Sequence, residues 1–136
     1  MVNLKNISKV EELRSIIISF FLFIFIIGCN ETVLKSELVI INCIFYLDDQ
    51  LYSGKYKLQI GDRLTIGVVK KGVLKKEDFF LNNNLIMRKI KSNCDEGYQT
   101  NFKENGEIIS EGFFMSNKRI GKWRYFTKDS VYFVQY

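Results

Sequence analysis

The 136 residues include no histidine, so carboxylates and thiols are the first candidates for acid–base and nucleophilic chemistry in this sequence. Without an imidazole base, Ser-His-Asp hydrolysis, Cys-His nucleophiles and His-containing zinc sites are excluded. Three pairs of adjacent carboxylates remain as acid–base candidates, Asp48-Asp49, Glu77-Asp78 and Asp95-Glu96. Adjacent residues of a strand point to opposite faces, and all three pairs lie in or beside turn-like segments, so we interpret them as solvated charges. The sequence predicts no catalytic residues and no enzymatic activity. A hydrolase that joins Asp48 or Asp49 with Asp95 or Glu96 is a less favoured alternative.

Cofactor and metal motifs are also missing from the sequence. Gly67 and Gly72 have the outer spacing of a phosphate-binding loop, but Val73-Leu74 stand where Lys and Ser or Thr are required. No calcium-loop spacing is present either. We therefore expect no cofactor and no metal.

The N-terminal segment has the features of an export signal. A polar leader that carries Lys5, Lys9 and Arg14 precedes an apolar run from Ile16 to Ile27. These 12 residues would make about 18 Å of helix, which is short of the roughly 30 Å hydrocarbon core of a bilayer. The run is apolar on all sides, unlike a buried globular helix. It fits the hydrophobic region of a secretory signal peptide, which we expect to be helical.

The end of this run, Ile26-Ile27-Gly28-Cys29, resembles the lipobox of bacterial lipoproteins. The resemblance implies cleavage between Gly28 and Cys29 and attachment of diacylglycerol, with palmitate-type chains, to the Cys29 sulfur. Residues 1–28 would then be a lipoprotein signal peptide, and residues 29–37 the lipidated cysteine with a short tether. An uncleaved anchor with an incidental cysteine is the alternative. Two acyl chains hold a protein on a membrane durably, so we expect a lipid-anchored protein of the bacterial cell envelope, facing the periplasm or the cell surface.

Two further cysteines, Cys43 and Cys94, remain in the mature chain. Export would put them in an oxidising compartment, where a disulfide is allowed. Cys43 lies in an apolar segment and Cys94 in a turn-like one, so the sequence alone does not show whether their Cα atoms come within bonding range. We favour two separate thiols, with a disulfide as the alternative.

Residues 38–136 read as one all-β domain. Turn-like clusters recur every 8–14 residues, with strand-length segments between them, which favours an antiparallel meander. Tyr52–Ile60 alternates apolar and polar residues, as a strand with one covered face does. Leu38–Leu47 is apolar on both faces except Asn42, and predicts a central strand covered on both sides. Asn105-Gly106 is the best signal for a type I′ hairpin turn. The turn-like clusters are 48–50, 61–62, 70–72, 82–84, 93–97, 104–106, 116–118 and 128–130.

The chain also repeats itself. Residues 72–90 match residues 106–124 with six identities in nineteen positions, and a weaker match has an offset of 24 residues. Residues 97–136 resemble MORN-type repeats, most closely the short variant found in antitoxin-like proteins; residues 54–92 are a degenerate match. The resemblance implies stacked β-hairpins that form an elongated open sheet. The motif residues that carry it are Gly106, Gly112, Phe113, Phe114, Gly121, Trp123, Tyr125 and Phe126.

The charge pattern bears on the choice of partner. The net charge is +5, from 20 basic and 15 acidic residues, but the basic residues are dispersed and no nucleic acid is expected. Arg119 and Arg124, beside exposed Phe and Tyr, would suit a surface for a protein partner. We therefore expect a non-catalytic interaction module that binds the membrane through Cys29 and an envelope protein or a toxin through its sheet. An antitoxin or immunity protein that neutralises a toxin is the alternative.

Overall fold

The computed structural model describes residues 32–136, which form twelve strands and one 3₁₀ helix. The predicted signal peptide, with Gly28 and Cys29, lies outside the described residues. All-β architecture is confirmed, and within residues 32–136 no helix is long and apolar enough to span a bilayer. The elements are β1 Thr32–Leu34, η1 Lys35–Glu37, β2 Val39–Ile41, β3 Ile44–Leu47, β4 Gln50–Leu51, β5 Gly54–Ile60, β6 Arg63–Lys70, β7 Val73–Leu81, β8 Asn84–Lys91, β9 Glu96–Phe102, β10 Ile108–Met115, β11 Lys118–Phe126 and β12 Val131–Gln135.

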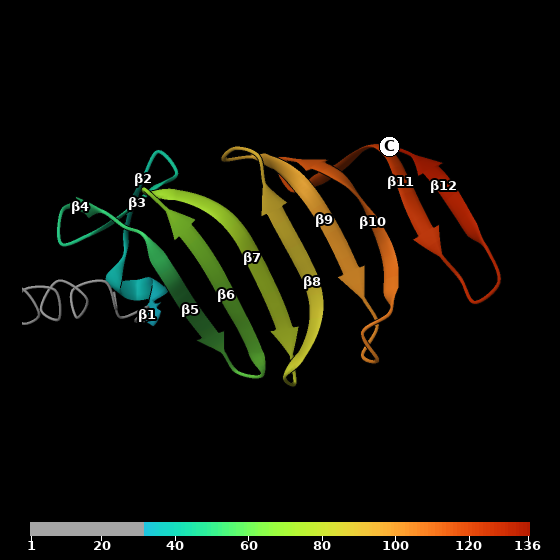
Figure 1. Cartoon of the computed structure of the whole chain (residues 1–136), viewed down its shortest axis with the longest axis horizontal. Coiled ribbons are helices and arrows are strands. Elements are labelled where there is room, and N and C mark those ends of the chain that lie inside the picture. Colours follow the sequence, from blue (N-terminus) through green and yellow to red (C-terminus); the bar gives the residue numbers. More distant parts are fainter. Residues whose placement is uncertain (1–31) are drawn as a thin grey trace, which may run out of the picture. The chain divides into compact units, whose positions relative to one another are not determined.

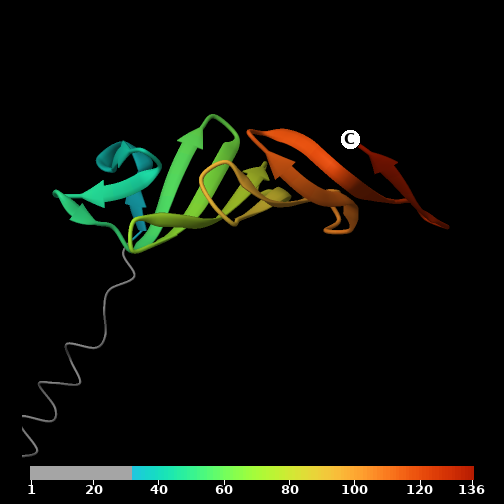
Figure 2. The same cartoon turned by 90° about the horizontal axis from the view of Figure 1, so that it is seen from above.

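The described strands make one open sheet, and Figures 1 and 2 show its main part, β5–β12, as a single layer. From β5 to β12 each strand pairs antiparallel with the next one along the chain. β1 pairs parallel with β5 at the N-terminal edge. β2, β3 and β4 form a small side sheet that joins the main one through the pair Ile44 and Val73.

Tight turns connect most strands, and every turn-like cluster named from the sequence falls at a connection between strands. Both residues of the turns Asn82-Asn83 and Ser116-Asn117 have positive φ, the signature of the type I′ turn that matches strand twist. The prediction for Asn105-Gly106 was wrong in detail. Only Gly106 has positive φ there, and Lys103 pairs with Glu107 to close a five-residue loop.

The prediction of one central strand over Leu38–Leu47 was also wrong. Asn42 and Cys43 both have positive φ and form a turn, so the segment folds back on itself as the β2–β3 hairpin. The segment's apolar character comes from β2, which is exposed, and from β3, which packs inward through Phe45. A run that is apolar on both faces does not reveal a turn at its centre, because asparagine is the only turn residue in it.

The tether is shorter than the predicted residues 29–37. Thr32–Leu34 pairs with Lys55–Lys57 as β1, and η1 follows directly. Glu37 accepts a hydrogen bond from the Leu34 backbone N–H at 2.9 Å, which closes this short helix. The folded part therefore begins by Thr32.

The N-terminal strands cover one end of the sheet and build its main core. Leu38 and Phe45 pack with Tyr52, Tyr56 and Val69, all 8% exposed or less. Phe45 and Tyr56 stack with ring centroids 5.7 Å apart. These N-terminal residues form a cap, which is a second layer of side chains over β5 and β6. The rest of the described sheet has no such second layer.

Both within the cap and beyond it, aromatic rings lie on glycines of the neighbouring strand. A Cβ built on Gly67 would lie 2.1 Å from the Tyr56 ring, and one on Gly112 2.5 Å from the Trp123 ring. Gly97 is similarly close to Phe114 and also to the Ile90 carbonyl oxygen. Tyr56, Phe114 and Trp123 are the largest fully buried side chains in the described residues. Glycine thus lets a one-layer sheet bury large rings flat against its own backbone.

The internal repeats map onto hairpins in two ways. The stronger match relates the β7–β8 hairpin to β10–β11. Two strands of an antiparallel path separate β7 from β10, so they run in opposite directions and these two hairpins turn at opposite ends of the sheet (Figure 1). The weaker match at 24 residues relates β9–β10 to β11–β12, which run the same way. Only the weaker match therefore relates two hairpins by a simple translation along the sheet.

Candidate interaction surface

The two faces of the sheet differ in what covers them. We call the face that carries Tyr56, Phe114 and Trp123 the packed face. The opposite face of β8–β12 is called the open face. It carries exposed apolar side chains in place of buried ones, as the register of the strands shows.

An apolar row crosses the open face on four adjacent strands. Ile90 on β8 pairs with Tyr98 on β9, which pairs with Phe113 on β10, which pairs with Ile120 on β11. Phe113 is 58% exposed and Ile90 53%, although Tyr98 and Phe113 make an edge-to-face contact with centroids 5.1 Å apart. Contiguous exposed apolar side chains of this kind mark interaction sites.

A row of charged side chains runs beside the apolar row on the same face. Asp78 pairs with Arg88 through two hydrogen bonds of 2.6 and 3.2 Å, and Lys76 lies 2.7 Å from the same carboxylate. Further along, Glu111 forms an ion pair with Arg124. Opposite charges on adjacent strands stabilise a sheet and fix its register, so this row keeps the apolar row in place.

The environment of Asp78 sets its ionisation. Burial alone would raise the pKa of this carboxyl, but hydrogen bonds from Arg88 and Lys76 and their charges outweigh burial and hold the pKa below its ordinary value. Asp78 is 7% exposed, while the Arg88 and Lys76 side chains are 38% and 36% exposed. Solvent therefore screens the pair in part.

Replacing Asp78 with asparagine should lower the free energy of unfolding by about 1–2 kcal/mol at pH 7. Because the pKa of Asp78 is lower in the folded than in the unfolded state, the ionised carboxylate stabilises the fold at pH values above the unfolded pKa near 3.9. This stabilisation is lost as the pH falls through the folded pKa. Urea unfolding at pH 7 and at pH 2.5 should show a larger difference between wild type and variant at pH 7. Glu107→Gln, which breaks the exposed pair with Lys103, is the matched control and should change nothing measurable. An equal effect of Asp78→Asn at both pH values would contradict the assignment.

The C-terminal hairpin adds cations over aromatic rings on the open face. Lys122 Nζ lies 4.0 Å from the centroid of the Phe133 ring, and Arg124 lies 5.8 Å from that of Phe126. Phe133 is 52% exposed, and Met115 on β10 is 43% exposed. Aromatic residues, methionine and arginine are the types enriched in protein interfaces.

Arg119 and Arg124 do not form the joint surface predicted from the sequence. Arg119 stacks over Trp123 at 4.6 Å on the packed face, and its Nη1 donates hydrogen bonds to the Tyr125 and Tyr136 hydroxyls. Arg124 neighbours Tyr125 in the strand, so its side chain lies on the open face, with Glu111. Only Arg124 belongs to the candidate surface.

The other motif residues have structural positions. Gly106 and Gly121 have φ of +86° and +64°, a loop and a bulge respectively. Trp123 donates from Nε1 to the Phe113 carbonyl oxygen at 2.7 Å. Of the motif's aromatic side chains, Phe113 alone is more than half exposed. Sequence reasoning did not single out Ile90, Tyr98, Met115 or Phe133, because which face of each strand stays uncovered depends on the tertiary fold.

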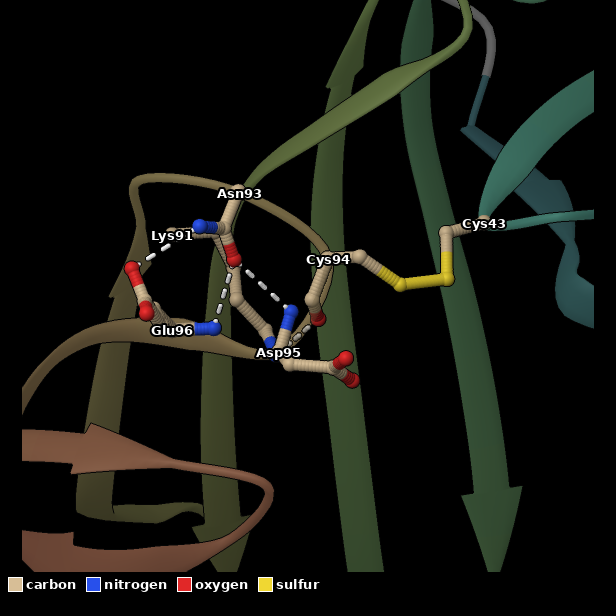
Figure 3. Close-up of a disulfide and its surroundings, with 6 residues drawn as sticks. All are labelled: Cys43, Lys91, Asn93, Cys94, Asp95 and Glu96. Carbon is tan, nitrogen blue, oxygen red and sulfur yellow. Dashed lines mark hydrogen bonds between the residues drawn. A yellow bond between two sulfur atoms is a disulfide. The ribbon is translucent and has the colours of Figure 1, made fainter.

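Cys43 and Cys94 form a disulfide, with Cα atoms 5.8 Å apart (Figure 3). It joins the β2–β3 turn to the β8–β9 turn, so the favoured expectation of two separate thiols does not hold. The Asn93 side-chain oxygen accepts hydrogen bonds from the backbone N–H groups of Asp95 and Glu96, and Lys91 Nζ donates to the Cys94 carbonyl (Figure 3). These bonds hold Cys94 in place.

A pocket of about 370 Å³ opens beside the disulfide. Ile40, Phe45 and Leu74 are among its apolar lining, and no carboxylate lines it. The pocket therefore does not join the carboxylates of the β3–β4 and β8–β9 turns. Among residues 32–136, no group of three or more His, Cys, Asp or Glu side chains is placed to hold a metal ion.

Comparison of the chain with protein-family models, with curated proteins and with solved structures finds no match.

Proposed function

We propose that this chain is a lipid-anchored protein of the bacterial cell envelope whose sheet binds a protein partner through its open face, without catalysis. The observation that carries the binding role is the apolar row on β8–β11, in which Ile90 and Phe113 are more than half exposed, flanked by a fixed row of charges. No layer of side chains in the described residues covers this row. A partner that buries it would remove a large apolar area from water.

The anchor and the compartment are supported by two separate observations. The lipobox-like sequence Ile26-Ile27-Gly28-Cys29 supplies the acylation site. The disulfide between Cys43 and Cys94 supports export, because disulfides persist in the periplasm and at cell surfaces and are rare in the cytosol. The predicted signal peptide and the disulfide thus both support a location of the folded part outside the cytosol.

The proposed relation to MORN-type repeats is supported by the antiparallel hairpins and by the placement of aromatic rings on glycines. In the C-terminal repeat, Gly112 and Trp123 form such a contact. The glycines and aromatic residues of the motif thus have a packing role, which leaves Phe113 as the motif residue that can reach a partner.

Replacing Phe113 with glutamate should lower the amount of partner recovered with the detergent-extracted protein at least tenfold, because a charge in the centre of an apolar contact is costly to desolvate. Affinity purification followed by mass spectrometry measures the recovery. Ile60→Glu is the matched control, since Ile60 is 67% exposed and lies on β5, outside the open face. Equal recovery with both variants would contradict the assigned surface.

The antitoxin or immunity function remains the second candidate, and the C-terminal repeat favours it. It predicts that the recovered partner is a toxin encoded nearby and that deletion of this gene alone is harmful. Full viability of the deletion strain beside each neighbouring gene product would remove this candidate and leave the binding module.

A further inference from the structure

The side sheet of β2, β3 and β4 has two faces of different kinds. Its inner face carries Phe45, which packs in the core. The strand register shows which residues share the outer face, because directly paired residues point to the same side of a sheet. Val39 pairs with Tyr46, Tyr46 with Leu51, and Ile41 with Ile44. We call these five residues the outer apolar face: Val39, Ile41, Ile44, Tyr46 and Leu51.

The outer apolar face is open to solvent in the described structure. Val39, Ile41 and Leu51 are 55%, 57% and 56% exposed. A sheet face in contact with water normally carries polar side chains, whereas this one has four aliphatic residues and a tyrosine. It needs an apolar neighbour.

The turn beside this face carries two lysines. A Cβ built on Gly72 would lie 2.8 Å from both Ile44 Cγ2 and Leu51 Cδ2, so the turn that carries Lys70 and Lys71 reaches the rim. This turn lies by the start of β3, whereas the acidic turn Asp48-Asp49 follows its end. The rim thus has one basic end.

The sequence places the outer apolar face close to the proposed anchor. Thr32, the first residue of β1, is three residues after Cys29, a stretch that spans at most about 11 Å when extended. Val39 is ten residues after Cys29. The elements β1 and η1 lead straight into β2, so acyl chains on Cys29 would keep this part of the sheet beside the bilayer.

We propose that the outer apolar face lies against the bilayer that holds the acyl chains of Cys29, with Lys70 and Lys71 toward anionic headgroups; this rests on the proposed lipid anchor. The aliphatic side chains enter the boundary between headgroups and acyl chains, and Tyr46 suits the same depth. The contact holds the N-terminal end of the sheet on the membrane. The open face, on β8–β12 at the other end of the strand order, stays available to a partner.

A bilayer suits this face better than a protein does. Protein interfaces carry about one hydrogen bond per 100–200 Å², and the Tyr46 hydroxyl is the one polar side-chain group among the five residues. The open face has the opposite composition, with arginine, glutamate and lysine beside its aromatic residues. The two exposed surfaces thus fit two different neighbours.

Photo-crosslinking tests the contact on the full-length protein as processed by cells. A photoreactive phenylalanine analogue replaces Ile41 in one variant and Ile60 in the control, which is 67% exposed on β5. Each purified protein is reconstituted in vesicles of phosphatidylcholine and phosphatidylglycerol, irradiated and analysed by mass spectrometry for phospholipid adducts and for acylation of Cys29. Circular dichroism before irradiation checks that both variants are folded. We expect at least five times more phospholipid adduct at position 41 than at position 60.

Each outcome is decisive. An acylated Cys29 with equal adducts at both positions overturns the bilayer contact and leaves the anchor. An unmodified Cys29 overturns both. The same variants are also irradiated in intact cells, where a protein adduct at position 41 in place of a lipid adduct would show that a protein covers this face.

Discussion

Replacing Trp123 with alanine should lower the free energy of unfolding by about 3–5 kcal/mol, the usual cost of removing a fully buried tryptophan. Trp123 is 0% exposed, lies on Gly112 and donates a hydrogen bond to the Phe113 carbonyl. The open sheet has no second layer to collapse into the space, so little of the loss is recovered. Urea unfolding followed by circular dichroism measures the change. Tryptophan fluorescence cannot be used, because Trp123 is the only tryptophan and the variant lacks it.

Two controls separate burial from ring chemistry. Phe133→Ala removes a ring that is 52% exposed and should cost about 1 kcal/mol or less. Gly112→Ala should destabilise the wild type, since its Cβ would lie 2.5 Å from the indole, but much less so the Trp123→Ala variant. Equal effects of Trp123→Ala and Phe133→Ala, or additive effects at positions 112 and 123, would refute the aromatic–glycine contact.

Removing the disulfide by Cys43→Ser and Cys94→Ser together should lower the free energy of unfolding by about 2–4 kcal/mol. The bond joins residues 51 apart in sequence, so reduction releases a long loop in the unfolded chain. In the folded state it ties the β2–β3 hairpin, which meets β7 in a single ladder pair, to the β8–β9 turn. Thermal unfolding of wild type and double variant, each with and without dithiothreitol, measures the effect.

The reductant should lower the unfolding temperature of the wild type to that of the double variant and leave the double variant unchanged. Cys29→Ser is the control and should keep the full response to reductant. If dithiothreitol changed neither the unfolding temperature of the wild type nor its mobility on a non-reducing gel, Cys43 and Cys94 would not be bonded.

Local features of the fold could be predicted from the sequence because short-range chemistry decides them. The clusters of Asn, Asp, Gly and Ser mark connections, and the alternation in Tyr52–Ile60 marks a strand with one covered face. The turn at Asn105-Gly106 shows the limit. Asn-Gly fits a two-residue turn, but the ladder between β9 and β10 closes at Lys103 and Glu107, so the loop is longer.

Long-range features could not be predicted, since they depend on which strands meet. Nothing local brings Cys43 to Cys94; their contact needs the β2–β3 turn and the folding of that hairpin beside β7. Arg119 and Arg124 were predicted to share a surface because they are close in sequence, but they are five residues apart in β11, so strand alternation puts them on opposite faces. The open face itself depends on which side of β9–β11 the buried rings of Phe114 and Trp123 occupy.

Metabolic labelling with an alkyne analogue of palmitate, compared between wild type and Cys29→Ser, tests whether Cys29 carries the lipid anchor. We predict that the wild type is labelled and fractionates with membranes, whereas Cys29→Ser is unlabelled and keeps its signal peptide. Equal labelling of both proteins, or none in either, would contradict a lipid anchor at Cys29 and with it the proposed place of this protein in the cell envelope.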